Sequence, residues 1–449
     1  MNATIYTCQK CEHAPEAFGD MLMQKIAVVD STNLYFMSRG QQYNTPLPLK
    51  PVNLRSLVET ALYAGVDALW VLPGSIGHIH SAIAPKKFTE GQHYETRKST
   101  DSKGIPYSVL AWRKNGSYEE RRAIMICFPG HDTRWGLEEI TGPTRLLAAL
   151  NALQDELELP IMWSPGHVGR ALMKRENEGK REQWVRAPGQ LPDMMGDVHF
   201  MAKDLRKKEA IPLIDGEWYL HVFDKNSMYL AAATGCNLGE GQPTLQKNIA
   251  FNAKWPGLWR YGDCWLWTPE LEYHLKGENG LTGAIIEEAY VWPLYHQTLR
   301  SWGEALWLAR KNLKEINTDA YEIIKAIATQ GLGWLAHKPA AGNSQWYRPD
   351  WWSMIVATAR AKMLYKAQAI YREYGVSPVW FDVDEIGFVS SDPNPRTAFP
   401  SMLTHEGHLG GFKITGSTLI DGEIIEAFDE KNTYQTCKKV LKRRLEKWT

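Results

Sequence analysis

The sequence of 449 residues contains no apolar run of the roughly 18 residues that a membrane-spanning helix needs. Its first twenty residues are polar and lack the apolar segment that directs secretion. The 6 cysteines are widely spaced, which excludes the disulfide framework of a small secreted domain. These absences predict a cytoplasmic protein with no membrane partner.

An excess of charge is also absent, because 51 basic residues balance 51 acidic ones. A chain coated in basic surface is therefore excluded, although a local basic groove is not. Cys8 and Cys11, with His13 nearby, form a single CxxC, whereas a structural zinc site usually has four ligands. A frayed tail over residues 1–20 is the favoured interpretation, and a zinc site is the alternative.

Tryptophan, by contrast, is abundant, with 19 copies. The simpler interpretation is that these side chains fill cores and anchor interfaces, and the alternative is a platform on which bases stack. Within residues 253–273, Trp alternates with polar residues, which is typical of β-structure. This pattern predicts a Trp-rich insertion over about residues 250–280.

The hydrophobic pattern predicts a domain boundary near residue 205. Residues 21–205 contain short apolar strands and an amphipathic helix that begins after Gly-Pro at 142–143, which favours an α/β domain. A charged stretch at 203–210 favours a linker or a solvated surface. Residues 206–449 contain strands, three long helical patterns and a basic C-terminal helix, which predicts a mixed α+β domain.

Acidic residues follow two of the predicted strands. Asp224 ends the strand GEWYLHVF, and Asp382 and Asp384 lie in the turn of the hairpin WFDVDEIGF. Alternation predicts that Asp382 and Asp384 share one face, with Val383 on the other. If the strand of Asp224 lies beside this hairpin, the carboxylates could hold two cations, which suits an in-line phosphoryl displacement.

A third segment carries a lysine on a helix. Lys325 precedes Thr329, Gly331 and Gly333 in the run KAIATQGLG. A lysine can act as a point charge on a triphosphate. The glycines have no side chains, so a base pair could pack against the helix surface there. The alternative is an ordinary helix that ends at glycine.

In this order, the three segments resemble motifs A, B and C of family B DNA polymerases. The run Asp224-Lys-Asn-Ser227-Met-Tyr229 is closest to the protein-primed branch found in phages and linear plasmids. The helix that carries Arg360, the strand of Lys413 and the run from Lys431 to Tyr434 also resemble elements of that family. The resemblance covers about residues 214–436.

The resemblance implies a right-hand polymerase palm with helical fingers and a reduced thumb. The preceding α/β domain would be exonuclease-like, with an RNase H-like fold, or something else. Catalysis and the binding of two Mg²⁺ or Mn²⁺ ions fall to Asp224, Asp382 and Asp384. The implied nucleotide-binding residues are Ser227, Tyr229, Lys325, Thr329, Gly333, Arg310, Lys311 and Lys314. The implied DNA-binding residues are Lys413, Lys431, Tyr434, Lys438, Lys442 and Arg443.

The implied function is template-directed DNA synthesis from dNTPs in a bacterial or phage-infected cell. The implied partners are a primer-template and either a terminal protein primer or another replication protein. The alternative is a catalytically impaired polymerase-fold protein that binds DNA ends or replication intermediates. Leu332 stands where the family has Tyr, which fits an enzyme with altered nucleotide selection or loose fidelity and also a polymerase fold in decay.

Proofreading is not expected. The family's nuclease needs Asp-x-Glu at its first strand, and here the strand is followed by Asp30-Ser31-Thr32. The other acids of this region, Asp132, Asp193 and Asp197, have no recognisable motif around them.

Overall fold

The computed structural model describes separate stretches of residues 25–177 and 205–211, and the continuous stretches 216–278, 284–336, 347–429 and 431–445. Cys8, Cys11, Asp132, Asp193 and Asp197 lie outside the described residues. By contact, the chain divides into two units. The first is Met1–Trp184 with Ser301–Tyr347, and the second is Val185–Arg300 with Arg348–Thr449. The division predicted near residue 205 remains a prediction.

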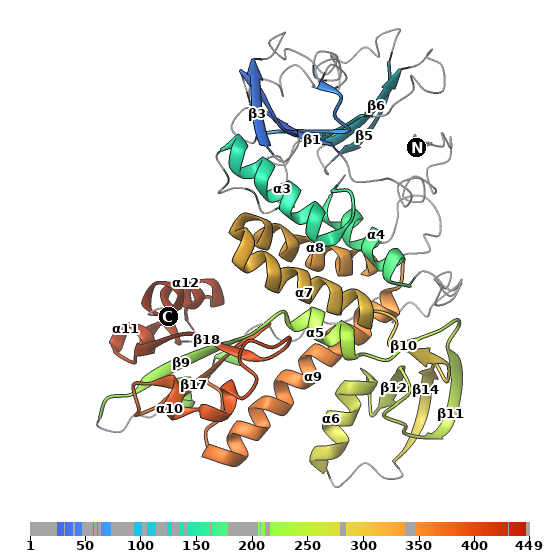
Figure 1. Cartoon of the computed structure of the whole chain (residues 1–449). Helices are drawn as coiled ribbons and strands as arrows, with labels where there is room; N and C mark the ends of the chain where they lie inside the picture. The colour runs from blue at the N-terminus through green and yellow to red at the C-terminus, as the bar shows by residue number, and fades with distance from the viewer. Residues whose placement is uncertain are drawn as a thin grey trace. The chain divides into compact units, whose positions relative to one another are not determined.

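A seven-stranded sheet in the order β3-β2-β1-β4-β7-β6-β5 forms the centre of the first unit (Figure 1). The first three strands form an antiparallel meander, and β1, β4 and β7 run parallel. Every residue of β1 and β4 is buried, as expected of short apolar strands inside a sheet. The bounds are β1 Ile26–Val29, β2 Asn33–Ser38, β3 Gln41–Pro46, β4 Ala68–Val71, β5 Tyr94–Thr100, β6 Pro106–Arg113 and β7 Ile124–Cys127.

Helices α3 and α4 lie against α8, and α3 also contacts β1 (Figure 1). The helices predicted after Gly-Pro and in two of the long helical patterns are confirmed. Their bounds are α3 Pro143–Leu157, α7 Arg300–Ile316 and α8 Thr318–Ala336, and α4 Pro165–Asn177 is a further helix that was not predicted. Gly169 of α4 and Gly331 of α8 meet directly, since a Cβ built on Gly169 would lie 2.9 Å from the Gly331 Cα.

An antiparallel five-stranded sheet in the order β18-β9-β17-β16-β8 forms the core of the second unit. Along β9, Leu220 and Val222 pack with α11 and α12 on one face, while His221 and Phe223 contact Phe399 on the other. The strands are β8 Leu205–Arg206, β9 Tyr219–Lys225, β16 Trp380–Asp382, β17 Glu385–Ser390 and β18 Phe412–Leu419. The helices are α5 Met228–Gly235, α9 Pro349–Tyr374, α10 Pro395–Ala398, α11 Gly422–Ala427 and α12 Tyr434–Arg444.

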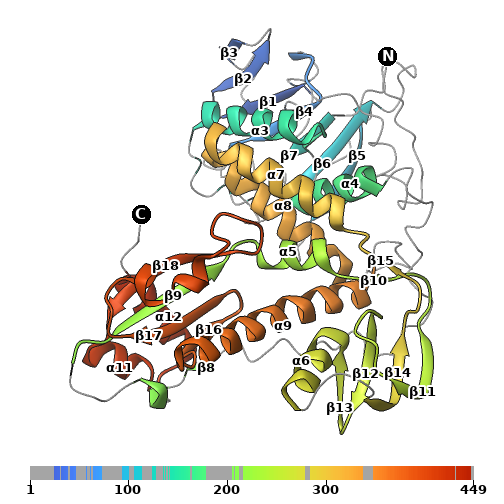
Figure 2. The same cartoon turned by 60° about the horizontal axis from the view of Figure 1, so that its bottom comes forward.

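The Trp-rich insertion forms a small sheet in the order β11-β14-β12-β13, with α6 packed on it and against α9 (Figure 2). The predicted β-structure is confirmed for the β12–β13 hairpin but is wrong from Thr268 onward, where Pro269 and Glu270 begin a helix. Trp259 is fully buried and its indole Nε1 donates to Thr268 Oγ1 at 2.8 Å, so it is a core residue. The bounds are β10 Leu238–Gly239, β11 Thr244–Ala250, β12 Gly257–Tyr261, β13 Cys264–Trp267, α6 Thr268–Glu278, β14 Ile285–Val291 and β15 Tyr295–His296.

Among the described residues, no helix combines the length and the apolar character needed to cross a membrane.

Candidate active site

Asp224 and the acidic hairpin meet at one end of the five-stranded sheet. β9 pairs with β17 so that Asp224 lies opposite Glu385, and Glu385 lies opposite Asp382 across the hairpin. The Lys225 backbone N–H donates to the Asp384 carbonyl oxygen at 2.8 Å. Sheet pairing therefore brings acids about 160 residues apart in the sequence to one place.

The hairpin turn differs from the expectation. Alternation was expected to put Asp382 and Asp384 on one face, but Asp382 ends β16 and Asp384 lies in the two-residue turn. Val383, the other turn residue, has a left-handed φ of 38°, which is strained for a β-branched residue. The turn therefore aims Asp384 independently of the strand pleat.

Negative charge is crowded at this turn. Burial, and then the charges of Asp224, Glu385 and Asp382, raise the pKa of Asp384 to about 7. Burial and the charge of Asp382 also raise the pKa of Glu385. Ionising these neighbouring carboxylates together is costly unless a cation lies between them.

Two lysines reach these acids. Lys413 Nζ lies 2.8 Å from Asp224 Oδ2, across the β9–β18 ladder. Lys438 of α12 forms an ion pair with Asp382, a contact that raises the pKa of Lys438 although burial lowers it. Both lysines were predicted to bind DNA, and both neutralise carboxylates here.

The donor chemistry at the turn fits a hard divalent cation. Asp224 and Asp384 offer only oxygen atoms, which Mg²⁺ prefers, and a cation would offset the burial and the neighbouring charges that raise the pKa of Asp384. In the part of the chain that the structure describes, no group of three or more His, Cys, Asp or Glu side chains is arranged as a metal site. Asp382 is held by Lys438 instead.

Asn226 is locked to a glycine loop. Its N–H donates to the Gly411 carbonyl and its carbonyl accepts from the Gly410 N–H, both at 2.9 Å. A Cβ on Gly410 would lie 2.8 Å from the Ala231 Cβ, and one on Gly411 would lie 1.8 Å from the His405 carbonyl oxygen. Only glycine fits at these two positions. The loop therefore fixes the backbone that follows Asp224.

Tyr229, in the first turn of α5, stacks on Trp352 of α9 with 6.0 Å between ring centroids and an interplanar angle of 26°. Burial and the charge of Asp384 raise the pKa of the Tyr229 hydroxyl, so the ring lies near the acidic turn. The turn before it is tight, because Ser227 has a left-handed φ of 50°. Trp352 is a neighbour that the sequence motifs did not indicate.

Arg360 connects this region to the insertion. Its guanidinium lies 2.9 Å from the carboxylate of Glu270 in α6. Burial lowers the pKa of Arg360, and the charge of Glu270 opposes this shift. The insertion is therefore fastened to α9 by an ion pair as well as by packing.

The residues predicted to bind the triphosphate form a cluster of their own in the first unit. Arg310 and Lys325 both lie over the Tyr321 ring, 5.0 Å and 4.5 Å from its centroid. Lys325 Nζ also lies 2.7 Å from Glu322. Three further predicted residues, Lys311, Lys314 and Thr329, are exposed.

The two glycines after Lys325 have different environments. A Cβ on Gly331 would lie 3.2 Å from both Gly169 and Trp302, so this glycine permits helix packing. Gly333 has nothing within 4 Å of the equivalent position. The helix does not end at either residue, which contradicts the ordinary-terminus interpretation of this segment.

The C-terminal helix α12 contacts β16 near the acidic turn, through Lys438 at Asp382 and Tyr434 at Trp380. Tyr434 stacks on Trp380 with centroids 5.1 Å apart and rings nearly parallel at 4°. Arg443 pairs with Glu423, whereas Lys431 and Lys442 are exposed. Their predicted contacts with DNA remain predictions.

Asp30 has a structural role in the first unit. Its carboxylate accepts from the N–H groups of Thr32 and Asn33, each at 2.7 Å, and from the Tyr35 hydroxyl at 3.0 Å. Burial alone would raise the pKa of Asp30, but these hydrogen bonds lower it overall. The carboxylate thus caps the turn between β1 and β2.

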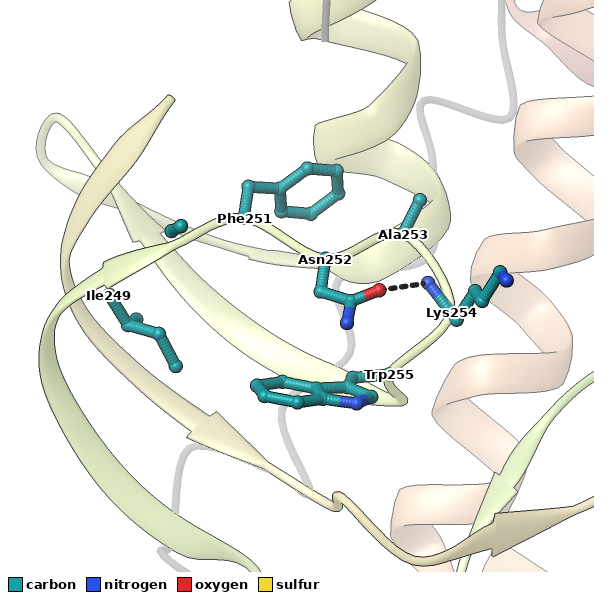
Figure 3. A pocket seen from close by; sticks show the side chains of 7 residues that line it. Ile249, Phe251, Asn252, Ala253, Lys254 and Trp255 are labelled. Atoms are coloured by element: carbon teal, nitrogen blue, oxygen red, sulfur yellow. Dashed lines mark hydrogen bonds between the residues drawn. The ribbon is translucent and has the colours of Figure 1, made fainter. Parts of the chain in front are cut away.

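A pocket of about 510 Å³ lies in the insertion, between β11 and β12 (Figure 3). Phe251 and Trp255 line it together with Asn252, whose Oδ1 accepts from the Lys254 N–H at 3.0 Å. The pocket combines aromatic walls with an amide and a lysine, but it contains none of the predicted catalytic residues.

No family model and no curated protein matches the sequence. Among solved structures, phi29 DNA polymerase complexed with single-stranded DNA matches at a TM-score of 0.53 and 12% identity, covering 88% of this chain and 84% of that one. The ternary complex of phi29 DNA polymerase with primer-template DNA and incoming nucleotides gives 0.52 and 11%, covering 89% and 85%. The family B DNA polymerase from Pyrobaculum calidifontis gives 0.36 and 11%, covering 94% and 64%. The fold of this chain therefore resembles that of phi29 DNA polymerase, as the motifs predicted.

Proposed function

We propose that this chain is a template-directed DNA polymerase that transfers nucleotides from dNTPs to a primer end. The observation that carries the proposal is the meeting of Asp224 with the Asp382–Asp384 hairpin at one end of the five-stranded sheet. The residues that resemble motifs A and C thus lie side by side, in a chain with a polymerase-like fold. An acidic cluster would repel a nucleic acid unless cations or lysines neutralised it.

The contacts support different roles for the carboxylates and for the two lysines. Asp224 and Asp384 would hold two divalent ions, Mg²⁺ or Mn²⁺, with Asp382 beside them. Bound ions of this kind lower the cost of charge on the attacking and leaving oxygens. Lys413 and Lys438 form ion pairs with Asp224 and Asp382. We propose that the same two lysines also bind phosphates of a primer strand.

Nucleotide selection is assigned to two groups of side chains. Tyr229, backed by Trp352, would lie under the sugar and exclude a 2′-hydroxyl. Lys325 and Arg310, gathered on Tyr321, would contact the triphosphate, as charge stabilisation of phosphoryl transfer requires. Leu332 is buried, so it offers no aromatic face to a base pair.

The topology supports a proposal for the finer architecture. The five-stranded antiparallel sheet would be the palm, α7 and α8 the fingers, and α11 with α12 a reduced thumb. The order β3-β2-β1-β4-β7, with an antiparallel meander followed by parallel strands, supports an RNase H-like first unit. Proofreading is not proposed, since Asp30 is taken up by its own turn.

The proposed partners are a primer-template and dNTPs. The phi29 structures include complexes with primer-template DNA and with incoming nucleotides, which supports the same partners here. The insertion, with its aromatic pocket, is the candidate surface for a terminal protein or for a DNA strand.

A second function has one observation in its favour. Lys413 and Lys438 already neutralise Asp224 and Asp382, as expected in a polymerase-fold protein that binds DNA ends or replication intermediates without synthesis. Such a protein would bind DNA equally well without its carboxylates.

Primer extension separates the two functions. Wild-type protein, Asp224→Asn, Asp384→Asn and a control, Asp263→Asn in the exposed β12–β13 turn, would be compared on a labelled primer-template with Mg²⁺ or Mn²⁺ and dNTPs. We expect extension by the wild type and the control, and a loss of about 100-fold or more in the other two variants. A wild type that binds DNA without extending it, while both variants bind equally well, would establish the second function.

A further inference from the structure

Three lysines gather on the face of the five-stranded sheet that lies opposite the acidic site. Lys225 follows Asp224 in β9, so the two side chains point to opposite faces. The contacts agree, since Lys413 reaches Asp224 while Phe412, its neighbour in β18, lies under Lys225. The cluster is therefore separate from the candidate metal site.

Helix α9 contributes the other two lysines. Thr358, Lys362 and Lys366 are spaced four residues apart and form one stripe of the helix. Lys362 Nζ lies 3.5 Å from the Ala231 carbonyl oxygen of α5, and Lys366 Nζ lies 2.7 Å from the Ser401 carbonyl oxygen. The stripe thus faces α5 and the segment around Ser401.

Lys225 is the most enclosed member. Its side chain belongs to a residue only 6% exposed, and the ammonium lies 5.2 Å from the centroid of the Phe412 ring. Within the described residues it donates no hydrogen bond to a protein atom, and no carboxylate forms an ion pair with Lys225, Lys362 or Lys366. Lys225 interacts electrostatically with both other lysines. An ammonium on a residue only 6% exposed, beside two like charges, would be stabilised by an anion that joins them.

We propose that Lys225, Lys362 and Lys366 form a binding site for a phosphate group. Lysine ammoniums act as point charges on phosphate oxygens, and three of them suit a group that carries more than one anionic oxygen. The phosphate can belong to the backbone of a nucleic-acid strand, or it can be free phosphate or pyrophosphate. The site does not depend on the proposed polymerase activity.

Two variants and two controls test the site. Lys362→Gln removes one charge from the partly open side of the cluster, and Lys225→Met removes the enclosed one. Lys247→Gln, in the exposed part of β11, removes the same charge elsewhere. Asp224→Asn reports on any phosphate that binds at the acidic site instead.

Free anions are tested by thermal unfolding of each protein against sodium phosphate and pyrophosphate, with sodium chloride at matched ionic strength. Strand phosphates are tested by anisotropy of a labelled single-stranded oligonucleotide over a range of salt. We expect wild type, Lys247→Gln and Asp224→Asn to bind one of these ligands alike, and Lys362→Gln to bind it about tenfold more weakly.

The two sources give different results. Free anions would raise the melting temperature of the wild type more than that of the cluster variants at the same concentration. A strand would bind with a salt slope that falls by about one for each lysine removed. The proposal is overturned if Lys362→Gln, folded as judged by its melting transition in chloride, responds to every ligand as the wild type does. A phosphate effect that disappears in Asp224→Asn would also overturn it, because it would assign the anion to the acidic site.

Discussion

Tyr229 and Trp352 illustrate how one residue acts through another. The Tyr229 ring is held by stacking on Trp352, 123 positions further along the chain. We expect Trp352→Ala to loosen the ring and to raise ribonucleotide incorporation, relative to dNTP, by about tenfold, since an aromatic pair contributes about 0.5–1.5 kcal/mol. The measurement is the ratio of kcat/KM for a matched rNTP and dNTP. Tyr371→Ala, at an exposed position of α9, is the control. An unchanged ratio in Trp352→Ala would remove Trp352 from nucleotide selection.

His221 is a buried histidine whose charge state should affect stability. Its Nε2 lies 2.9 Å from the Asp392 carbonyl, so Nε2 carries the proton and Nδ1 accepts from Ser417 at 2.8 Å. Burial lowers the pKa of His221 from its usual 6.5. Because the folded form resists protonation, its stabilisation is complete above pH 6.5 and is lost as pH falls through the lowered pKa.

We therefore expect the melting temperature of the wild type to fall more between pH 7.5 and pH 5.5 than that of His221→Gln. Thermal unfolding of both proteins at the two pH values measures this difference. Equal falls would show that His221 has the same pKa in the folded and the unfolded protein, which would contradict the lowered pKa.

At the scale of single residues, the acidic residues of the candidate site were predictable from the sequence, whereas the residues around them were not. A strand-end Asp and an Asp-x-Asp hairpin have local signatures that survive without tertiary information. The left-handed φ of Val383 has no such signature, and it displaced Asp384 from the strand alternation that was expected. Trp352 and the lysine stripe of α9 depend on which segments pack together, which periodicity alone does not show.

The crossing of α4 and α8 is an element-scale feature that depends on glycine. A Cβ on Gly169 would lie 2.7 Å from the Ile327 carbonyl oxygen, which belongs to the backbone and cannot move aside easily. We expect Gly169→Ala to cost about 1–3 kcal/mol through overpacking. Gly333→Ala, in an open position of α8, should instead be neutral or stabilise by up to about 1 kcal/mol. Chemical unfolding of both variants measures the contrast, and equal effects would contradict the packing role of Gly169.

Helix α12 combines a buried face with a basic one. Leu441 is 3% exposed in the core beneath α11 and α12, whereas Lys442 beside it is exposed. We expect Leu441→Ala to cost about 2–4 kcal/mol of stability, and Lys442→Ala to change stability by less than about 0.5 kcal/mol.

For DNA binding we expect the opposite ranking, with a larger effect for Lys442→Ala than for Leu441→Ala. Lys442→Ala should lower the salt slope of primer-template binding by about one. Binding isotherms at several salt concentrations, set beside chemical unfolding, test both halves. If Lys442→Ala bound the primer-template as the wild type does, α12 would pack on the sheet without contacting DNA through Lys442.

Element types were predictable where the pattern was long. Helices α7, α8 and α9 follow from sustained helical spacing, and short buried strands such as β1 and β4 follow from apolar runs. The helix that begins at Thr268 was missed, because Trp alternation up to Trp267 was extended across a Thr-Pro start signal. The need for glycine at 410 and 411 was not predictable, because it depends on how closely Ala231 and the His405 carbonyl approach these positions.

At the scale of the whole molecule, the fold carries information that overall sequence similarity does not. At 12% identity, phi29 DNA polymerase matches this chain over most of its length. The three motifs predicted that relationship because they place acids and a lysine at fixed points of one topology. Side chains can change as long as sheets and helices still pack, so two chains can share a fold at this identity.

In the acidic turn, we expect the arrangement of carboxylates that suits metal binding to lower the stability of the metal-free protein. Burial, and then the charges of Asp224, Glu385 and Asp382, raise the pKa of Asp384, so keeping this carboxylate ionised without metal should cost stability. We expect Asp384→Asn to raise the melting temperature without metal, since the amide removes one of the repelling charges. In the wild type, Mg²⁺ or Mn²⁺ should raise the melting temperature by binding the folded state, and this response should be small in Asp384→Asn.

Thermal unfolding with and without each metal tests both statements independently of any activity. Ca²⁺ in the same titration serves as a hard-cation comparison, and Asp263→Asn, outside the turn, should keep the full response of the wild type. If Asp384→Asn were less stable than the wild type without metal, repulsion would not be the dominant force at this turn. If its metal response equalled that of the wild type, the cations would bind elsewhere and the two-ion assignment of Asp224 and Asp384 would fail.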